Sequence, residues 1–331
     1  MTYSNFNQIF DQFNQLRVLI IGDVMLDAYI WGTVDRISPE APVPVMRTTR
    51  RDYRLGGAAN VALNVQALGA TPVLCAVIGN DDGGSKVKER LEVNGMTDEG
   101  IVISGDRPTT VKTRVMSGHQ HIVRVDEETD KLLNEAEESS LLDTVRLLME
   151  GCDVVIFEDY DKGVITTSII EATVALASAN GVPVVVDPKK RNFLNYHGVT
   201  LFKPNLKELR EGLKIDIDKN NKAEIEAAVA ELNKELGSKG SLITLSEKGV
   251  FIDFSDEKWH IPAHLREISD VSGAGDTVIS IAALCVALKL PPKTVAALSN
   301  LGGGLVCEHV GVVPIDKNDL LQEANKLHLI S

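Results

Sequence analysis

The chain has 331 residues, of which 44% are hydrophobic and 24% are charged, as in ordinary globular proteins. Its formal net charge of −13 argues against a protein that binds nucleic acid or an anionic membrane over a broad surface. The N-terminus lacks the pattern of a signal peptide, and the longest nearly apolar run, 278–288, is too short to span a bilayer. We therefore expect a soluble, cytoplasmic protein with no nucleic-acid or membrane partner. The four cysteines lack a C-x-x-C spacing and have apolar neighbours, which predicts buried, reduced thiols.

Short apolar runs alternate with helical patterns along most of the chain. The run at 17–22, RVLIIG, is typical of a strand covered on both faces of a parallel sheet. Similar runs are found at 72–78, 153–157, 183–187, 241–245 and 249–254. Helical patterns are found at 58–68, 83–94, 135–149, 166–180, 221–236, 274–288 and 293–308. This alternation predicts a doubly wound α/β sheet.

Two stretches interrupt the alternation. Residues 27–49 contain three prolines and cannot be helical. Residues 107–126 are rich in basic side chains and have the alternation of a hairpin with a turn at 117–120. Together they predict a small antiparallel sheet that acts as a lid over a ligand cleft. Because no linker or repeat is evident, we expect a single domain over 1–331 with these two lid insertions.

The segment 270–277, DVSGAGDT, carries the strongest chemical signal. The small residues Gly273, Ala274 and Gly275 at the start of a helix leave backbone N–H groups bare, which is suited to binding a phosphate. Asp276 lies in the first turn beside that site, where a carboxylate can accept the proton of an attacking hydroxyl. The alternative is a plain capped helix in which Asp276 interacts only with the helix dipole.

Two further segments predict a polar ligand. Asp23 and Asp27 follow the first strand, at the sheet edge where α/β folds bind ligands. Gly56 and Gly57 permit close approach to the backbone, and Asn60 offers both a donor and an acceptor. The alternatives are loop capping by the aspartates and a tight turn packed on the sheet.

Asn205 and Glu208 are three residues apart at the start of a helix and share a face. Glu208 is a candidate to hold Mg²⁺ through water, and the alternative is a capping box made by the same two residues.

Two nucleotide-binding motifs are missing. No G-x-G-x-x-G follows the first strand, and 79–86, GNDDGGSK, has no lysine where a phosphate loop needs one.

Taken in order, Gly-Gly, Asn-x-x-Glu and Gly-Ala-Gly-Asp resemble the motifs of the ribokinase-like (PfkB) carbohydrate kinases, from about Arg17 to Val313. The resemblance implies a three-layer α/β/α fold, ATP and Mg²⁺ as cofactors, Asp276 as the base and 273–275 as its anion hole. It also implies further site residues. Sugar contacts would come from Asp23, Asp27, Gly56, Gly57 and Asn60, and Mg²⁺ would be associated with Asn205 and Glu208. The phosphates and ribose of ATP would contact Thr244, Ser246 and Gly249. The adenine would contact His264, Val271 and Asn300. K⁺ would lie near Asp270 and near 308–313.

A narrower resemblance, carried by 22–45 and by Asp187-Pro188-Lys189, is to the D-glycero-D-manno-heptose 7-phosphate kinases. These phosphorylate the anomeric C1 hydroxyl to give a 1,7-bisphosphate on the route to ADP-heptose and lipopolysaccharide. Many are fused to an adenylyltransferase, and because no H-x-G-H motif is present we expect the kinase alone. Such a substrate needs cations, for which Arg36, Lys189 and Lys203 are candidates, with a solvated surface as the alternative. Lys203 departs from the Thr that many relatives have before Pro-Asn.

Other functions stay open at this point. The nearest is a kinase of the same family that acts on ribose, fructose or a fructose phosphate. A non-catalytic sugar-binding protein and a nicotinamide-dependent dehydrogenase are further alternatives. The unpaired edges of the lid also predict a homodimer made through the lid.

Overall fold

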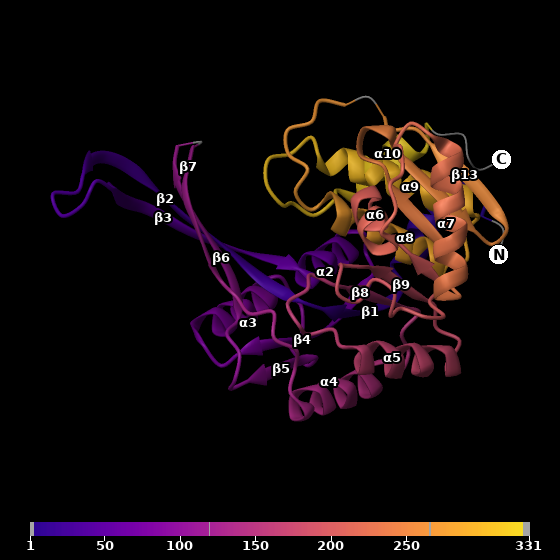
Figure 1. Ribbon diagram of the computed structural model, residues 1–331, viewed down its shortest axis with the longest axis horizontal. Coiled ribbons are helices and arrows are strands. Elements are labelled where there is room, and N and C mark those ends of the chain that lie inside the picture. Colours follow the sequence, from indigo (N-terminus) through magenta and orange to yellow (C-terminus); the bar gives the residue numbers. More distant parts are fainter. Residues whose placement is uncertain (1–2, 119, 265, 327–331) are drawn as a thin grey trace.

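The computed structural model describes residues 3–118, 120–264 and 266–326, and these contain a large central sheet in the order β13-β12-β11-β10-β9-β8-β1-β4-β5 (Figure 1). Seven of its strands are mutually parallel: β1 (Arg17–Gly22), β4 (Thr71–Gly79), β5 (Ile101–Ser104), β8 (Val154–Glu158), β9 (Val184–Asp187), β10 (Leu201–Phe202) and β11 (Gly240–Thr244). β12 (Val250–Phe254) and β13 (Glu257–Ile261) add an antiparallel edge.

Helices cover both faces of this sheet, which confirms the predicted three-layer α/β/α fold. Successive strand residues point to opposite faces, so Val18 and Ile20 enter one apolar core while Leu19 and Ile21 enter the other. The first core is closed by α1 (Phe6–Phe13), α2 (Ala58–Ala67), α3 (Asp82–Val93), α8 (Ala274–Ala287), α9 (Pro292–Val306) and α10 (Lys317–Ala324). The second is closed by α4 (Glu135–Leu148), α5 (Thr167–Ala179), α6 (Leu206–Leu213) and α7 (Lys222–Leu236).

A second, four-stranded sheet projects away from the main body, to the left in Figure 1. Its order is β3-β2-β6-β7, with β2 (Val24–Ile37), β3 (Pro44–Gly57), β6 (Thr110–Ser117) and β7 (Gln120–Glu127). The two hairpins are antiparallel, as predicted, but the central pair β2–β6 is parallel. The reason is that β2 and β6 both leave the main body in the same direction before their hairpins turn back. The first insertion is also longer than the predicted 27–49, and His119 of the second lies outside the described residues.

All four cysteines are buried and unbonded to one another, as predicted. Across the described ranges, every helix is too short or too polar to cross a membrane.

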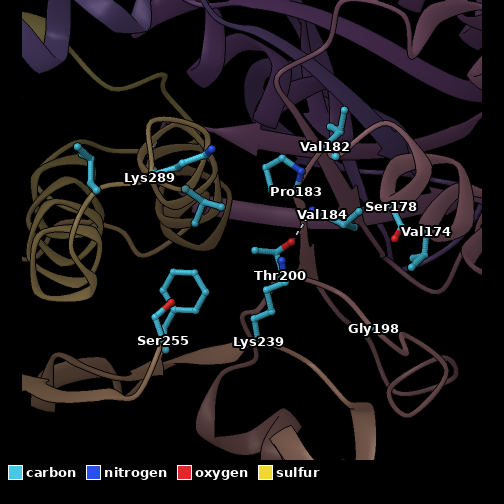
Figure 2. A pocket seen from close by; sticks show the side chains of 14 residues that line it. Val174, Ser178, Val182, Pro183, Val184, Gly198, Thr200, Lys239, Ser255 and Lys289 are labelled. Carbon is cyan, nitrogen blue, oxygen red and sulfur yellow. Dashed lines mark hydrogen bonds between the residues drawn. The ribbon is translucent and has the colours of Figure 1, made fainter. Parts of the chain in front are cut away.

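One pocket lies at the amino ends of the strands, between Val184, Thr200 and Lys239, and Figure 2 shows these residues around it. In α/β sheets ligands bind at the opposite, carboxyl edge, which is where the predicted site residues gather.

Candidate active site

The carboxyl edge of the sheet places a row of ionisable side chains under the start of α8. The strand register sets Gly22, Glu158 and Asp187 side by side at the ends of β1, β8 and β9. Glu158 and Asp187 lie two residues beyond Ile156 and Val185, whose side chains enter the core that α2 and α8 close, so they face the same way. Lys203, two residues beyond Leu201, extends the row at the end of β10 by the same alternation.

Lys203 and Asp187 form a buried ion pair. The Lys203 ammonium lies 2.7 Å from Asp187 Oδ2, and only 3% and 5% of the two side chains are exposed. A Cβ built on Gly275 would lie 3.6 Å from Asp187 Oδ2 and 3.8 Å from Lys203 Nζ, so the Gly-Ala-Gly turn rests directly above this pair. Lys203 is therefore part of the site around α8 rather than a solvated surface residue.

Asp276, in the first turn of α8, is held by two donors from other parts of the chain. The Asn60 amide donates to Oδ2 at 2.6 Å, and the Tyr160 hydroxyl donates to Oδ1 at 2.9 Å. Burial raises the pKa of Asp276 to about 6, the negative charge of Asp187 adds to this, and the two hydrogen bonds work against it. The carboxylate is thus ionised but basic near neutral pH, as a proton acceptor must be.

The turn before Asp276 is more open than Asp276 itself. Gly273 has φ +81, a left-handed conformation that glycine adopts readily, and it starts α8 without a side-chain cap. Residues 273–275 are half-buried whereas Asp276 is buried. The Ala274 N–H donates to the Val271 carbonyl at 3.3 Å, and the remaining first-turn amides are the ones that a helix leaves without an internal acceptor. Because the Asp276 side chain is bound to Asn60 and Tyr160, the dipole-only alternative does not account for its placement.

The two aspartates after β1 have different surroundings. Asp23 is buried and accepts the backbone N–H groups of Tyr160, Lys162 and Val164, so loop capping, the alternative, is what the structure has. These three bonds leave Asp23 Oδ1 with one further acceptor position, so contact with a sugar hydroxyl stays a prediction. Asp27 instead pairs with Arg114 of the lid strand β6.

The paired glycines and Asn60 line the same side of the site. A Cβ on Gly56 would lie 2.8 Å from Met25 Cγ and 2.9 Å from Asp27 Oδ2, so a larger residue there would have to displace these side chains. Gly57 has φ +59 at the start of α2, where a Cβ would lie 2.3 Å from the Asp23 carbonyl oxygen. Asn60, predicted as a sugar contact, uses its amide group on Asp276, and its Oδ1 has no protein partner among the described residues.

Glu158 is the unexpected member of the row. It is 1% exposed, and neither of its carboxylate oxygens has a hydrogen-bond partner in the described part of the chain. Burial, followed by the charges of Asp187 and Asp276, raises the pKa of Glu158 well above its ordinary range, and Lys203 and Lys189 offset only part of this. Burial without a hydrogen-bond partner thus favours the neutral form of Glu158.

With this geometry in place, comparison with known proteins decides the family. Residues 15–318 match the family described as pfkB family carbohydrate kinase. The chain belongs to this family. It is 36% identical over 321 residues to the "Bifunctional protein HldE" of Syntrophotalea carbinolica, with 97% of this chain and 65% of the relative covered. It is 41% identical over 317 residues to the protein of the same name from Caulobacter sp. strain K31, with 96% and 64% covered. The chain therefore spans just under two thirds of the length of these relatives.

Solved structures agree on the fold of this carbohydrate kinase. Phosphofructokinase-2 from Escherichia coli in complex with potassium aligns with a TM-score of 0.78 at 17% identity, covering 94% of this chain and 98% of that one. Arabidopsis thaliana ribokinase complexed with ribose and ATP aligns with a TM-score of 0.71 at 19% identity, covering 93% and 99%. At these identities the likeness establishes the ribokinase-like fold alone.

The Asn-x-x-Glu segment of the kinase starts α6. Asn205 and Glu208 form the capping box that was the alternative: the Glu208 N–H donates to Asn205 Oδ1 at 2.9 Å, and the Asn205 N–H donates to Glu208 Oε2 at 2.8 Å. Glu208 Oε1 also pairs with Lys189 Nζ at 2.6 Å. Since both carboxylate oxygens are engaged, Glu208 suits an ion held through water better than direct ligation. Within the described ranges, no group of three or more His, Cys, Asp and Glu side chains is placed to hold a metal.

Several residues predicted to meet ATP are brought together at the β11–β13 side. Asn205 and Thr244 form an isolated parallel bridge, which joins the Asn-x-x-Glu segment to the end of β11. Gly249 has φ +87, and a Cβ there would lie 2.0 Å from the Ile261 carbonyl oxygen. Asn300 of α9 donates to the Pro262 carbonyl at 2.8 Å. Ser246 and Val271 are exposed, and His264 is half-buried with Nε2 unpartnered in the described residues.

Asp270 connects its own segment to the C-terminal loop 308–313, which the sequence predicts to lie near K⁺. Its Oδ1 accepts the Ser272 N–H and hydroxyl, and its Oδ2 accepts the Gly311 N–H at 2.9 Å. Partial burial works to raise the pKa of Asp270, but these hydrogen bonds outweigh it and hold the pKa below its usual value. The two segments predicted for K⁺ are thus neighbours, and ion binding there stays a prediction.

One predicted residue lies apart from the rest. Arg36 is exposed near the outer end of β2, opposite Val45, and nine residues of extended chain, roughly 30 Å, separate it from Asp27. Contact of Arg36 with the substrate stays a prediction that this single chain does not support.

The sequence did not predict the roles of Tyr160 and Glu158 or the ion pair made by Asp187. Glu158 follows an apolar run just as Asp23 does, so the same strand-end rule could have found it, whereas nothing local indicates the contact of Tyr160 with Asp276.

Proposed function

We propose that this carbohydrate kinase transfers the γ-phosphoryl group of ATP to the C1 hydroxyl of D-glycero-D-manno-heptose 7-phosphate, giving the 1,7-bisphosphate. The observation that carries the proposal is the environment of Asp276: a buried, basic carboxylate, oriented by Asn60 and Tyr160, directly beside the half-exposed turn 273–275. This arrangement places a proton acceptor next to bare amides at a helix start, as transfer of a phosphoryl group to an alcohol requires.

In this proposal Asp276 takes the proton of the sugar hydroxyl as its oxygen attacks the γ-phosphorus, and the bond to the ADP oxygen breaks in line. The first-turn amides of α8 offset the negative charge on the transferred group. Lys203, whose ammonium lies under Gly275, adds a positive charge at the same place. Mg²⁺, when bound with ATP, would neutralise phosphate charge, with Glu208 and Asn205 as its associated residues. Thr244, Ser246, Gly249, His264, Val271 and Asn300 would surround the rest of the nucleotide.

The choice of a heptose phosphate rests on the resemblance of 22–45 and 187–189 and on the relatives named HldE. Basic side chains are present around the lid base to receive a sugar phosphate, among them Lys189, Arg107 and Lys112. The second candidate is another sugar of the same family, such as ribose, fructose or a fructose phosphate. We place the reaction in the cytoplasm, where ATP is available and the buried thiols stay reduced.

Product analysis tests the substrate. With ATP and Mg²⁺, heptose 7-phosphate is expected to release ADP and to yield a second phosphorus NMR signal coupled to the proton on C1. Ribose, fructose and fructose 6-phosphate serve as parallel substrates at equal concentration. A higher kcat/KM for one of these would replace the heptose assignment while leaving the kinase chemistry intact. Absence of ADP release with all of them would contradict the proposed reaction.

We also propose that two chains, each a single unit of main domain and lid, associate through their lids. β3 and β7 are the edge strands of the lid sheet, and Val123 and Val125 of β7 share one face with about half of each side chain exposed. Gel filtration is expected to give twice the mass of one chain, and Val123→Lys combined with Val125→Lys is expected to shift it to the monomer. A monomer from the unaltered chain would contradict this association.

A further inference from the structure

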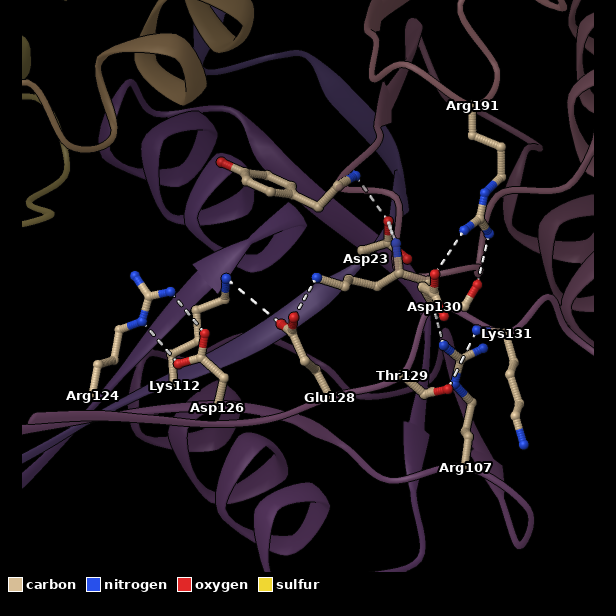
Figure 3. Close-up of polar contacts among 12 residues, drawn as sticks. Asp23, Arg107, Lys112, Arg124, Asp126, Glu128, Thr129, Asp130, Lys131 and Arg191 are labelled. Atoms are coloured by element: carbon tan, nitrogen blue, oxygen red, sulfur yellow. Dashed lines mark hydrogen bonds and ion pairs between the residues drawn. The ribbon is translucent and has the colours of Figure 1, made fainter.

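The loop between β8 and α5 carries Tyr160 to the catalytic carboxylate. Its backbone is fixed by Asp23, which accepts the N–H groups of Tyr160 at 2.8 Å and of Lys162 at 3.1 Å. The same loop is tied to the lid base, where Glu128 lies between Lys112 of β6 and Lys162 (Figure 3). Arg107 also donates to the Lys162 carbonyl. Tyr160 thus sits on a segment whose position is set from several sides.

The direction of the hydrogen bond between Tyr160 and Asp276 is determined by their surroundings. Burial, with the nearby negative charge of Asp276, raises the pKa of Tyr160 well above its ordinary value, so its hydroxyl keeps its proton and donates. Lys189 Nζ lies 5.3 Å from the centroid of the Tyr160 ring and is itself paired with Glu208, so it adds a second contact to the ring. The hydroxyl therefore has a fixed ring and a fixed role as donor to Asp276 Oδ1.

We propose that Tyr160 is a positioning residue for the phosphoryl-transfer reaction, because its hydroxyl orients Asp276 and stabilises the ionised form of that carboxylate. This inference rests on the proposed role of Asp276 as the base. With Oδ1 held by Tyr160 and Oδ2 held by Asn60, the plane of the carboxylate is fixed and each oxygen keeps one lone pair for a substrate hydroxyl. A base held in this way needs no reorientation before it accepts a proton.

The other ionisable groups around Asp276 come from neighbouring strands. They are Glu158 of β8, Asp187 at the end of β9 and Lys203 after β10. Burial favours the neutral form of Glu158, and Lys203 is paired with Asp187. Loss of the Tyr160 hydroxyl would therefore leave Asn60 as the remaining side-chain donor to Asp276 in the described residues.

Tyr160→Phe removes the hydroxyl and keeps the ring. Because a donor to the ionised form is lost, the pKa of Asp276 should rise, and the acid limb of the kcat–pH profile should move upward by about one unit. Turnover of heptose 7-phosphate with ATP and Mg²⁺ should fall most at pH 6 and recover toward pH 9. The KM for ATP should change little, since the bond that the hydroxyl makes is to Asp276, the proposed base.

Tyr196→Phe is the matched control. Tyr196 is buried, and its hydroxyl also donates to an aspartate, Asp159 Oδ2 at 2.8 Å, but it does not contact Asp276. An acid limb that is unmoved in Tyr160→Phe, or moved equally in Tyr196→Phe, would overturn the proposal. The ¹³C carboxyl signal of Asp276, assigned by its loss in Asp276→Asn, gives a second measurement in the protein without substrate. Its titration midpoint should rise in Tyr160→Phe, and this readout tests Tyr160 even if Asp276 proves not to be the base.

Discussion

Asp276→Asn should keep ATP and sugar binding and lose at least ~10²-fold in turnover. Asparagine has nearly the shape of aspartate, so the pocket made by Asn60 and Tyr160 can accommodate it, but it does not accept the proton of the sugar hydroxyl. The Tyr160 donor still finds an amide oxygen, so the fold should persist. Single-turnover kinetics separates this loss in the chemical step from substrate binding measured by calorimetry.

Asp82→Asn is the control for the alternative in which a first-turn carboxylate only complements the helix dipole. Asp82 occupies the first turn of α3 as Asp276 does in α8, but it is exposed and remote from the turn 273–275. Asp82→Asn should leave turnover unchanged. Near-normal turnover in Asp276→Asn would remove Asp276 from the role of base.

Lys203→Met should lower the free energy of unfolding by about 3–5 kcal/mol, because it leaves Asp187 charged, buried and without its partner. Turnover should fall as well, since the ammonium lies beneath Gly275. Adding Asp187→Asn to Lys203→Met should recover a large part of the stability, because no uncompensated buried charge is left. Urea unfolding followed by circular dichroism measures both effects.

An exposed ion pair provides the comparison. Arg47 and Asp35 lie 2.9 Å apart on the lid with 77% and 59% of their side chains exposed, and breaking this pair should cost less than about 1 kcal/mol. Equal, small losses for Arg47→Met and Lys203→Met would show that the Lys203–Asp187 pair is not buried in solution as it is in this structure.

Much of the fold follows from local pattern. The apolar runs and helical periods located most of the parallel strands and most helices to within a residue or two, since strands covered on both faces leave a continuous apolar run. β5 contains only three consecutive apolar residues, and β13 alternates polar and apolar side chains at the sheet edge, so neither gave such a run. α1 was missed although Phe6, Ile9, Phe10 and Phe13 have helical spacing and are all buried.

The sequence predicted where single site residues lie, but not which side chains contact one another. Strand ends and helix starts identified Asp23, Asn60, Lys203 and Asp276, all of which lie at the carboxyl edge. Their partners are far away in sequence: Asn60 and Asp276 are 216 residues apart, and Tyr160 and Asp276 are 116 apart. Such pairings depend on how α2, α8 and the loop after β8 pack, which no local spacing encodes. The sequence therefore did not predict the bond from Asn60 to Asp276, while the sugar contacts of Asn60 and Asp23 stay predictions.

The unpartnered carboxyl of Glu158 couples folding to proton uptake at this residue. Burial raises the pKa of Glu158 well above that of an ordinary glutamate, so at a pH between the unfolded and folded pKa values the native state binds a proton that the unfolded state lacks. This contribution to stability is complete below the ordinary glutamate pKa and is lost as pH rises toward the folded value. Through this residue, mild acid favours the native protein, opposite to the usual effect of acid on paired carboxylates.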